Sequence, residues 1–425
     1  MLGPQFTRTN LRNDINDQLK GDISTTEQDR LINRAVRDVI NDEDIDLHTT
    51  KKMVSLSLSG DNFIKNESID GPDGSDLRTN IKNDADKYYW HCPADLKALI
   101  DVRKRYDKVD EFELSTAEQA LRRKSSFGQQ IAIDEQGFMR RLIVSGIEKL
   151  DQADVHNCDT YDGDGTWTAD GSQITAVATE TDNYVCGTGA VGFTTVSGAL
   201  AGGTLTNSNM DAVDLSGYTS HNLYIWVYIP MATGITSFTL KWGSSASAYY
   251  SKTVTATHDN TAFYVGWNLL KFSWPGATET GTVDDENIDY LQLTLIKGAT
   301  NTGTTGWIMD RIIAVQDSEH AVVYYTRYGW QTTAGIYLED STADTDKLNV
   351  EANGYKLILH RALEYCSEFI DDDKGEAKHM QKYTDKKEQY MSLYPSERKL
   401  MTTIYQGIQS TDEDYFVSDV DDTSS

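Results

Sequence analysis

A sharp change of composition near Leu150 and again near Glu319 is the strongest constraint on how this chain folds. The stretch between these points holds only five of the 39 Lys and Arg residues, but it holds six of the eight tryptophans. A surface loop tolerates an inserted domain when the two ends of the insert lie close together. The sequence therefore predicts a host domain in two parts, residues 1–150 and 319–406, an inserted domain, residues 151–318, and a tail, residues 407–425. The five basic residues are Lys241, Lys252, Lys271, Lys297 and Arg311, and the six tryptophans are Trp167, Trp226, Trp242, Trp267, Trp274 and Trp307.

The charge balance narrows the classes of function. The chain has 66 acidic and 39 basic residues, for a net charge of -27. This balance argues against nucleic-acid binding as the main task, because affinity for a duplex comes largely from Lys and Arg, but an acidic wall lets DNA pass. No apolar run approaches the ~20 residues that span a bilayer, and the N-terminus lacks the apolar segment of a signal peptide. We therefore expect a protein made in the cytoplasm that does not enter a membrane.

Residue patterns typical of enzymes and zinc sites are absent from the sequence. There is no HExxH pattern, Gly-rich phosphate loop or GxSxG elbow, so we expect a protein without enzymatic activity. His91 with Cys92, and His156 with Cys158, come nearest to a metal-binding pair, but neither has a matching second pair. The four cysteines, which also include Cys186 and Cys366, are expected to be free or buried thiols; Cys158 and Cys186 are able to pair under oxidising conditions.

The predicted host domain has helices with apolar stripes and a few strands. Residues 24–42 form a helix that Thr25 and Gln28 begin as a capping box, and helices are also expected at 112–123, 350–370 and 376–394. Strands are predicted at 52–58, 98–102, 138–144 and 321–328. The expected stripes are Leu31, Ile32, Ala35, Val36, Val39 and Ile40; Tyr355, Ile358, Leu359, Ala362, Leu363, Cys366 and Phe369; and Ala377, Met380, Tyr383, Tyr390, Met391 and Tyr394.

These elements, in this order, resemble the head-to-tail adaptor (connector) proteins of tailed bacteriophages. The resemblance rests on STTEQDRLINRAVRDVIND, on YYWHCPADLKALIDVR, on AVVYYTRY and on the two closing charged helices, roughly half of the chain. It implies a non-enzymatic virion protein at the neck, forming a dodecameric ring between the portal protein and tail or fibre proteins, through which DNA passes. The alternatives are another phage neck, baseplate or fibre-anchoring protein, or a carbohydrate-binding surface protein.

The insert is predicted to be an all-β sandwich. The predicted fold class is therefore α+β, with a helical host domain that a jelly roll interrupts. Alternating runs separated by turn residues predict strands at 174–178, 223–229, 238–242, 249–255, 268–274, 290–296 and 307–315. Three segments of the insert resemble carbohydrate-binding modules of the jelly-roll type: DAVDLSGYTSHNLYIWVYIP, GWNLLKFSW and GWIMDRIIAV. The insert is expected to project outward as a decoration, fibre-docking or glycan-binding module.

The sequence predicts two kinds of site in the insert and one site in the tail. An exposed aromatic platform for sugar is predicted among Trp167, Trp242, Trp267, Trp274, Tyr249 and Tyr250, with burial of these rings in the core as the alternative. A structural calcium ion is predicted at Asp159, Asp162, Asp164, Asp170 and Asp310, with a solvated acidic turn as the alternative; no other cofactor is expected. In the acidic tail, Tyr415, Phe416 and Val417 are predicted to dock on the portal.

Overall fold

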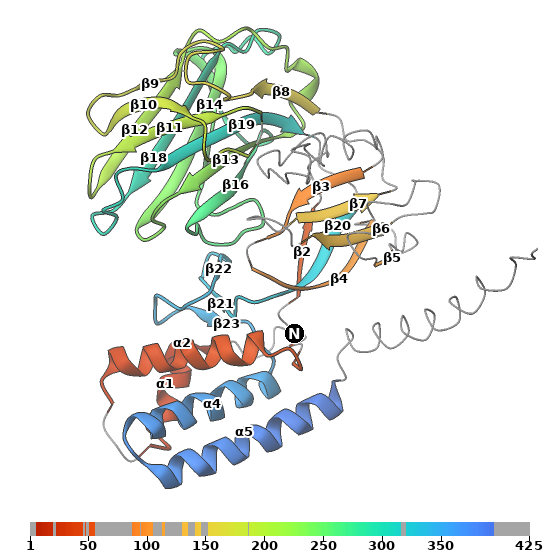
Figure 1. Cartoon of the computed structure of the whole chain (residues 1–425), viewed down its shortest axis with the longest axis vertical. Helices are drawn as coiled ribbons and strands as arrows, with labels where there is room; N and C mark the ends of the chain where they lie inside the picture. Colours follow the sequence, from red (N-terminus) through yellow and green to blue (C-terminus); the bar gives the residue numbers. More distant parts are fainter. Residues whose placement is uncertain are drawn as a thin grey trace, which may run out of the picture. The chain divides into compact units, whose positions relative to one another are not determined.

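The computed structural model describes residues 6–19, 23–45, 47, 51–55, 87–93, 95–104, 113–114, 130–134, 141–145, 152–185, 187–315 and 320–394 (Figure 1). Strands predominate in these ranges, which also contain four α-helices. The chain divides into two compact units: Met1–Lys52 with Asp95–Ile100 and Val323–Ser425, and Met53–Ala94 with Asp101–Val322. None of the helices in the described ranges has both the length and the apolarity needed to cross a membrane.

The four helices belong to the first unit. They are α1 (Arg8–Asn16), α2 (Thr25–Asn41), α4 (Ala352–Phe369) and α5 (Asp373–Leu393). Helix α2 begins as predicted, but its cap differs: the side chain of Ser24 accepts the hydrogen bond from Glu27 N, and the amide of Gln28 donates to Asn16 Oδ1. The predicted Thr25–Gln28 capping box is therefore wrong by one residue.

The apolar stripes of α2 and α4 form the core of this unit. All six predicted stripe residues of α2 are buried, as are six of the seven predicted for α4, and together with Leu11 and Ile15 of α1 they form one apolar cluster. Phe369 is the exception in α4, since it lies at the last turn and is 51% exposed. The stripe predicted for α5 is correct in part: Tyr390 is buried in this cluster and Tyr383 and Tyr394 pack against it, whereas Ala377 is exposed and Met380 is 55% exposed.

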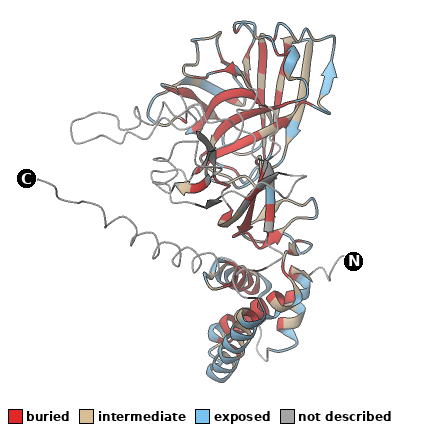
Figure 2. Ribbon diagram, turned by 90° about the vertical axis from the view of Figure 1, so that its right-hand side faces the viewer, coloured by how far each residue is buried: buried red, intermediate tan, exposed pale blue. Residues whose placement is uncertain are grey.

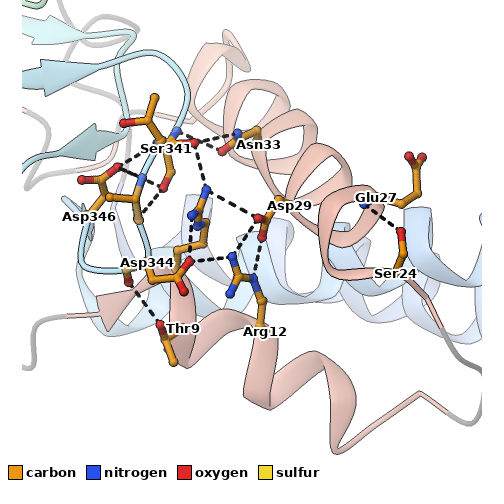
Figure 3. A network of polar contacts seen from close by, with 12 residues as sticks. Thr9, Arg12, Ser24, Glu27, Asp29, Asn33, Ser341, Asp344 and Asp346 are labelled. Atoms are coloured by element: carbon orange, nitrogen blue, oxygen red, sulfur yellow. Dashed lines mark hydrogen bonds and ion pairs between the residues drawn. The ribbon is translucent and has the colours of Figure 1, made fainter.

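A small antiparallel sheet and two arginines tie α1 to the rest of the first unit. The sheet order is β1 (Phe6–Thr7), β23 (Lys347–Leu348), β21 (Trp330–Gln331) and β22 (Tyr337–Leu338). Arg12 donates to Asp29 on α2 and, at 2.7 Å, to Asp344 (Figure 3). Arg8 donates to the same Asp344 oxygen and to the carbonyl oxygen of Ser341. The contacts with Ser341 and Asp344 join α1 to the segment between β22 and β23, more than 300 residues further along the chain.

Asp95 is the centre of a buried polar network in the first unit. Its carboxylate is fully buried and accepts from Lys52 Nζ at 2.8 Å, from Tyr324 Oη at 2.9 Å and from Thr326 Oγ1 at 2.6 Å. Lys52 also lies 4.2 Å from the ring centroid of Tyr337. The residues come from or flank β2 (Lys51–Ser55), β20 (His320–Thr326) and β4 (Leu96–Lys104), which form the sheet β2-β20-β4.

A separate four-stranded sheet precedes the sandwich along the chain. Its order is β3 (Lys87–His91), β7 (Arg141–Ser145), β6 (Gln130–Asp134) and β5 (Glu113–Leu114). These strands pair with one another, and the second compact unit takes in residues 53–94 and 101–150 together with the sandwich. The division thus differs from the predicted boundary at 150. Residues 115–123 of the helix predicted at 112–123 lie outside the described ranges.

The sandwich consists of two six-stranded antiparallel sheets. The first sheet is β10-β11-β19-β13-β16, with β8 also paired to β19, and the second is β17-β15-β14-β18-β12-β9. Figure 2 shows buried residues running through the strands, with exposed residues at loops and edges. The bounds are β8 Gln152–His156, β9 Thr168–Ala169, β10 Ile174–Glu180, β11 Ala190–Thr195, β12 Leu200–Asn207, β13 Asn222–Ile229, β14 Ile235–Ser245, β15 Ala248–Val254, β16 Gly266–Ser273, β17 Thr278–Thr280, β18 Tyr290–Lys297 and β19 Trp307–Val315.

All seven strands predicted for the insert are present. Their inward side chains meet in one core that includes Phe238, Leu240 and Trp242 from β14, facing Ile225 and Val227 from β13. Alternate residues of a strand point to opposite faces, so the identity of the core side also fixes the outward side. The all-β sandwich part of the predicted fold class is therefore confirmed, whereas the described helices do not establish an adaptor fold.

Candidate functional site: the outer face of the second sheet

The outward side chains of the second sheet form a polar face, which we call the hydroxyl face. Leu291, Leu293 and Leu295 of β18 are buried in the core, and the residues between them are not. The strand register carries this alternation across the whole sheet, because directly opposed residues share a face. The hydroxyl face comprises Thr278 and Thr280 of β17, Tyr249, Ser251 and Thr253 of β15, Ser237, Thr239 and Lys241 of β14, Tyr290, Gln292, Thr294 and Ile296 of β18, Thr204 and Thr206 of β12, and Thr168 of β9.

Two tyrosines flank a glycine at one end of the hydroxyl face. Gly243 of β14 is opposite Tyr249 on one side and Tyr290 on the other, and the two ring centroids are 6.3 Å apart. A Cβ atom at Gly243 would lie 2.2 Å from the carbonyl oxygen of Ala248 and 2.5 Å from Tyr249 Cα, so no side chain fits between the rings. Tyr290 is buried, and burial together with Tyr249 raises its pKa; Tyr249 is half-buried and presents the accessible ring.

The middle of the hydroxyl face has an ammonium group and an amide in fixed positions. Lys241 lies opposite Ser251 and Gln292, and its Nζ is 4.5 Å from the centroid of the Tyr249 ring. Cation–π contacts of this kind hold a lysine head group in place. The amide of Gln292 donates to Thr206 Oγ1 at 2.9 Å. These contacts restrict side chains that would otherwise move freely at the surface.

The outer side of the first sheet is largely covered over β13 and β16. Tyr224 and Trp226 of β13 and Trp267 and Leu269 of β16 point away from the sandwich core, yet each is at most 4% exposed. Trp267 is held by its indole N–H, which donates to Asn183 Oδ1 at 3.0 Å. These four side chains are therefore not accessible to a ligand, whereas Ala176 and Ala178 of β10 in the same sheet are exposed.

The prediction of an exposed sugar platform is wrong for its four tryptophans, because all four are buried. Trp167, Trp242, Trp267 and Trp274 are all at most 5% exposed, so none offers a ring face to a ligand. Trp167, Trp242 and Trp274 pack in the sandwich core, where a large ring contributes most to stability, and Trp267 lies beneath the covered outer side.

The two tyrosines of the predicted platform, Tyr249 and Tyr250, point to opposite faces of the second sheet because they are consecutive residues of β15. Tyr250 points inward and packs on Trp242 and Trp274 with ring centroids 6.0 and 5.2 Å away. Burial, with Asp285 next, raises the pKa of Tyr250 to about 12. Tyr249 alone of the six predicted residues lies on the hydroxyl face. The residues Lys241, Gln292 and Tyr290 were missed, although the alternation of the predicted strands at 238–242 and 290–296 contains the signal.

The predicted calcium ligands have other roles, and Asp170 is the clearest case. Its Oδ1 accepts from the backbone N–H groups of Ser172, Gln173 and Ile174, and its Oδ2 accepts from Thr204 N at 2.8 Å. Partial burial acts to raise its pKa, but the four donors outweigh burial and hold the pKa at about 2. Asp170 therefore closes the turn before β10 and ties it to β12.

The remaining predicted ligands do not gather around a common point. Within the described ranges, no three His, Cys, Asp or Glu side chains are placed as metal ligands would be. Asp162 is exposed, and Asp310 is fully buried. The backbone donors to the other carboxylates are Thr188 N to Asp159 at 2.9 Å, Asp211 N to Asp164 at 2.7 Å and Val185 N to Asp310 at 2.7 Å. Calcium binding by these residues stays a prediction.

His156 has a structural role. Its Nδ1 accepts from Cys158 N at 2.9 Å, so Nε2 carries the proton and donates to the carbonyl oxygen of Asp164 at 2.9 Å. Burial is the main cause that lowers its pKa. Burial, followed by Asp310, raises the pKa of the Cys158 thiol well above its usual range, so this thiol is unreactive. Cys186 lies outside the described residues, as do Tyr415, Phe416 and Val417.

No protein-family model and no curated protein matches this chain. Among solved structures, it is similar to a family 11 carbohydrate-binding module from Clostridium thermocellum in complex with a beta-1,3-1,4-mixed-linked tetrasaccharide. That match has 10% identity and a TM-score of 0.28, and it covers 40% of this chain and 98% of that one. A family 30 carbohydrate-binding module matches with 11% identity and a TM-score of 0.29, over 39% of this chain and 100% of that one. An exo-beta-agarase matches with 15% identity and a TM-score of 0.27, over 38% of this chain and 25% of that one.

Proposed function

We propose that the sandwich binds a carbohydrate chain along the hydroxyl face. The observation that supports this most directly is the contrast between the two outer sides: the first carries buried aromatic residues over β13 and β16, and the second presents hydroxyls, an amide, an ammonium group and a tyrosine ring. A sugar ring has apolar C–H patches and a rim of hydroxyls. An aromatic ring beside groups that both donate and accept hydrogen bonds suits such a ligand.

The hydroxyl face is long enough for an extended oligosaccharide. One row of outward residues crosses all six strands of the second sheet. Neighbouring strands lie ~4.8 Å apart, so the row spans roughly 24 Å. The row consists of Thr278, Ser251, Lys241, Gln292, Thr206 and Thr168.

Side chains on this face are held in place before any ligand arrives. Thr239 and Thr253 share a hydrogen bond of 2.7 Å, and Gln292 is fixed on Thr206. Ordering a free surface side chain on binding costs about 0.5–1.5 kcal/mol, so prior ordering favours affinity. The flat arrangement favours a chain that lies along the surface over a single sugar in a pocket.

Binding is tested by titrating the whole chain with a panel of soluble polysaccharides, followed by variants for any polymer that binds. Tyr249→Ala and Gln292→Ala should each weaken binding by about two- to tenfold, because each removes one aromatic or hydrogen-bonding contact. Thr181→Ala is the matched control, since Thr181 is exposed and follows β10 of the first sheet. Equal affinity of all variants would place the site elsewhere.

For the rest of the chain we propose the role implied by the sequence resemblance, a non-enzymatic ring adaptor at the virion neck between the portal and the tail or fibre proteins. The support from the first unit is its exposed apolar side chains: Phe369, Met380 and Leu393 are each more than half exposed on α4 and α5. Side-by-side packing in a closed ring would cover such residues. Native mass measurement of the assembled protein tests this, with a dodecamer expected and a stable monomer contrary to it.

A further inference from the structure

The hydroxyl face carries one charge, and that charge is positive. Lys241 is the one Lys, Arg, Asp or Glu residue in the defined set of outward side chains of the second sheet. Thr, Ser, Gln, Tyr and one Ile occupy the other positions of the face. In a chain with a net charge of -27, a set of outward positions without an acid is unusual, although the carboxylate of Asp170 lies at the edge of the face, where it accepts from Thr204 N.

Lys241 also differs from the other basic residues of the insert. The other four are engaged with protein groups or belong to the first sheet, whereas Lys241 has no ion pair or hydrogen bond among the described residues; its contact is the Tyr249 ring at 4.5 Å. For comparison, Lys252 donates to Gly276 O at 2.9 Å, Lys297 is buried with three oxygen acceptors, Arg311 pairs with Asp154 at 2.6 Å, and Lys271 lies 5.9 Å from the Tyr224 ring.

Neutral donors surround the ammonium group. Ser251 and Gln292 are the direct cross-strand neighbours of Lys241, on β15 and β18. A hydroxyl and an amide beside a lysine can together bind the oxygens of one anionic group, since all three are able to donate. The cation is therefore placed where a bound sugar chain would bring an acidic substituent.

Two acids, Asp284 and Asp289, lie beyond the tyrosine end of the face, while Glu279 lies between Thr278 and Thr280 of β17 and Asp170 lies two residues after Thr168. The backbone of Asp289 donates to Gly243 O, and the backbone of Asp284 donates to Ser244 Oγ. Lys241 is two residues further along β14, about 6.6 Å at 3.3 Å per residue, and the face continues away from Asp284 and Asp289. Acidic residues farther than ~8 Å from Lys241 are largely screened at physiological salt, so the net charge of the chain as a whole acts only weakly on this site.

Resting on the proposed function, we propose that the hydroxyl face selects an acidic polysaccharide and that Lys241 binds its carboxylate or sulfate group. Tyr249 fixes the ammonium group, and Ser251 and Gln292 complete the anion site. Discrimination against a neutral polymer arises because a neutral sugar leaves the lysine charge without a partner.

The experiment compares three polymers on the whole chain: polygalacturonate for carboxylate, dextran sulfate for sulfate, and mixed-linkage beta-glucan as the neutral polymer. Lys241→Gln should weaken binding to the preferred acidic polymer about three- to tenfold and leave any binding to the neutral polymer unchanged. Lys241→Arg should retain the preference. Lys252→Gln, which removes a lysine from the neighbouring strand β15, is the matched control and should bind like the unchanged protein.

The outcomes separate the two proposals. Tighter binding of either acidic polymer, lost in Lys241→Gln and kept in Lys252→Gln, supports the inference, and the polymer that binds identifies the anionic group. Binding of the neutral polymer with equal or greater affinity, unaffected by Lys241→Gln, overturns the inference while the proposed function stands. Absence of binding to neutral and acidic polymers alike would contradict both. Unchanged melting temperatures show that each variant is folded.

Discussion

His360 on α4 and His379 on α5 face each other with ring centroids 5.9 Å apart and planes inclined by 25°. The Nδ1 atom of each ring is buried and makes no hydrogen bond among the described residues. Burial, with Lys382 next, lowers the pKa of His360 to about 4, and burial followed by Lys378 lowers the pKa of His379. Lys386 adds to the positive surroundings, and Asp372 is the acid that opposes them. The helix interface therefore favours two neutral imidazoles.

This pair predicts an acid-sensitive helical unit. Both folded-state pKa values lie below the ordinary ~6.5, so the unfolded chain takes up protons first as the pH falls. The contribution to stability is complete above pH ~6.5 and is lost as the pH falls from there toward 4. We expect a loss of about 1–2 kcal/mol, reduced from the full shift because His360 is partly solvated. Urea unfolding followed by helix circular dichroism between pH 7.5 and 4.5 measures it.

A variant separates this pair from other acid effects. His360→Gln removes one titrating ring and should flatten the dependence on pH over the same range. His258→Gln, a change in the sandwich, should leave the helical transition as it was. An unchanged slope in His360→Gln would show that other groups cause the acid sensitivity.

The start of α2 yields a matched pair of substitutions. Ser24→Ala removes the side chain that accepts from Glu27 N, and losing such a cap costs about 1 kcal/mol. Thr25→Ala changes the first helical residue, which makes no such cap, and should cost much less. Chemical denaturation of both variants gives the comparison, and a larger effect at Thr25 would restore the capping box that the sequence suggested.

Asp170 is expected to stabilise the sandwich through its four backbone donors. Asp170→Asn loses the charge and one acceptor oxygen, and we expect a cost of about 1–3 kcal/mol. Because the folded pKa is about 2, below the ordinary ~3.9, this stability is present above pH ~4 and is lost as the pH falls toward 2. Asp162→Asn is the control, since Asp162 is exposed. Thermal unfolding at neutral pH and at pH 3 tests both; equal melting temperatures for the two variants would contradict the role of Asp170.

Gly243 is expected to tolerate no side chain. Gly243→Ala places a Cβ against the backbone of β15, where the close atoms are a carbonyl oxygen and a Cα that have little room to move. Overpacking of this kind costs about 1–3 kcal/mol, and it would also displace Tyr249. Gly217→Ala is the control, because a Cβ there meets nothing within 4 Å. Comparison of melting temperature and polysaccharide binding tests the pair. Full stability of Gly243→Ala would show that the strands are less tightly apposed.

The strands that sequence reasoning found are those with regular alternation of apolar and polar residues. It missed β11 and β12, whose sequences AVGFTT and LAGGTLTN are rich in Gly, Ala and Thr and resemble turns. Strand β12 has a register shift between Leu200 and Gly203, which further interrupts its period of two.

The candidate site was harder to predict than the strands. Composition shows that aromatic rings are present, but the face on which each one lies depends on the register of the strand. Trp242 and Lys241 are adjacent in sequence, and the sheet sends one into the core and the other onto the hydroxyl face. The stripe predicted for α5 is correct only for its three tyrosines, since the helical period does not tell how many neighbours a helix has.

The most direct test of carbohydrate binding by the sandwich is a structure of the whole chain with an oligosaccharide from the tightest-binding polymer. We predict that the sugar chain lies across the strands of the second sheet, with one ring beside Tyr249 and with hydrogen bonds to Gln292 and the neighbouring threonines. Sugar bound only at the loops that join the two sheets, or a bare hydroxyl face at saturating ligand, would contradict the central claim.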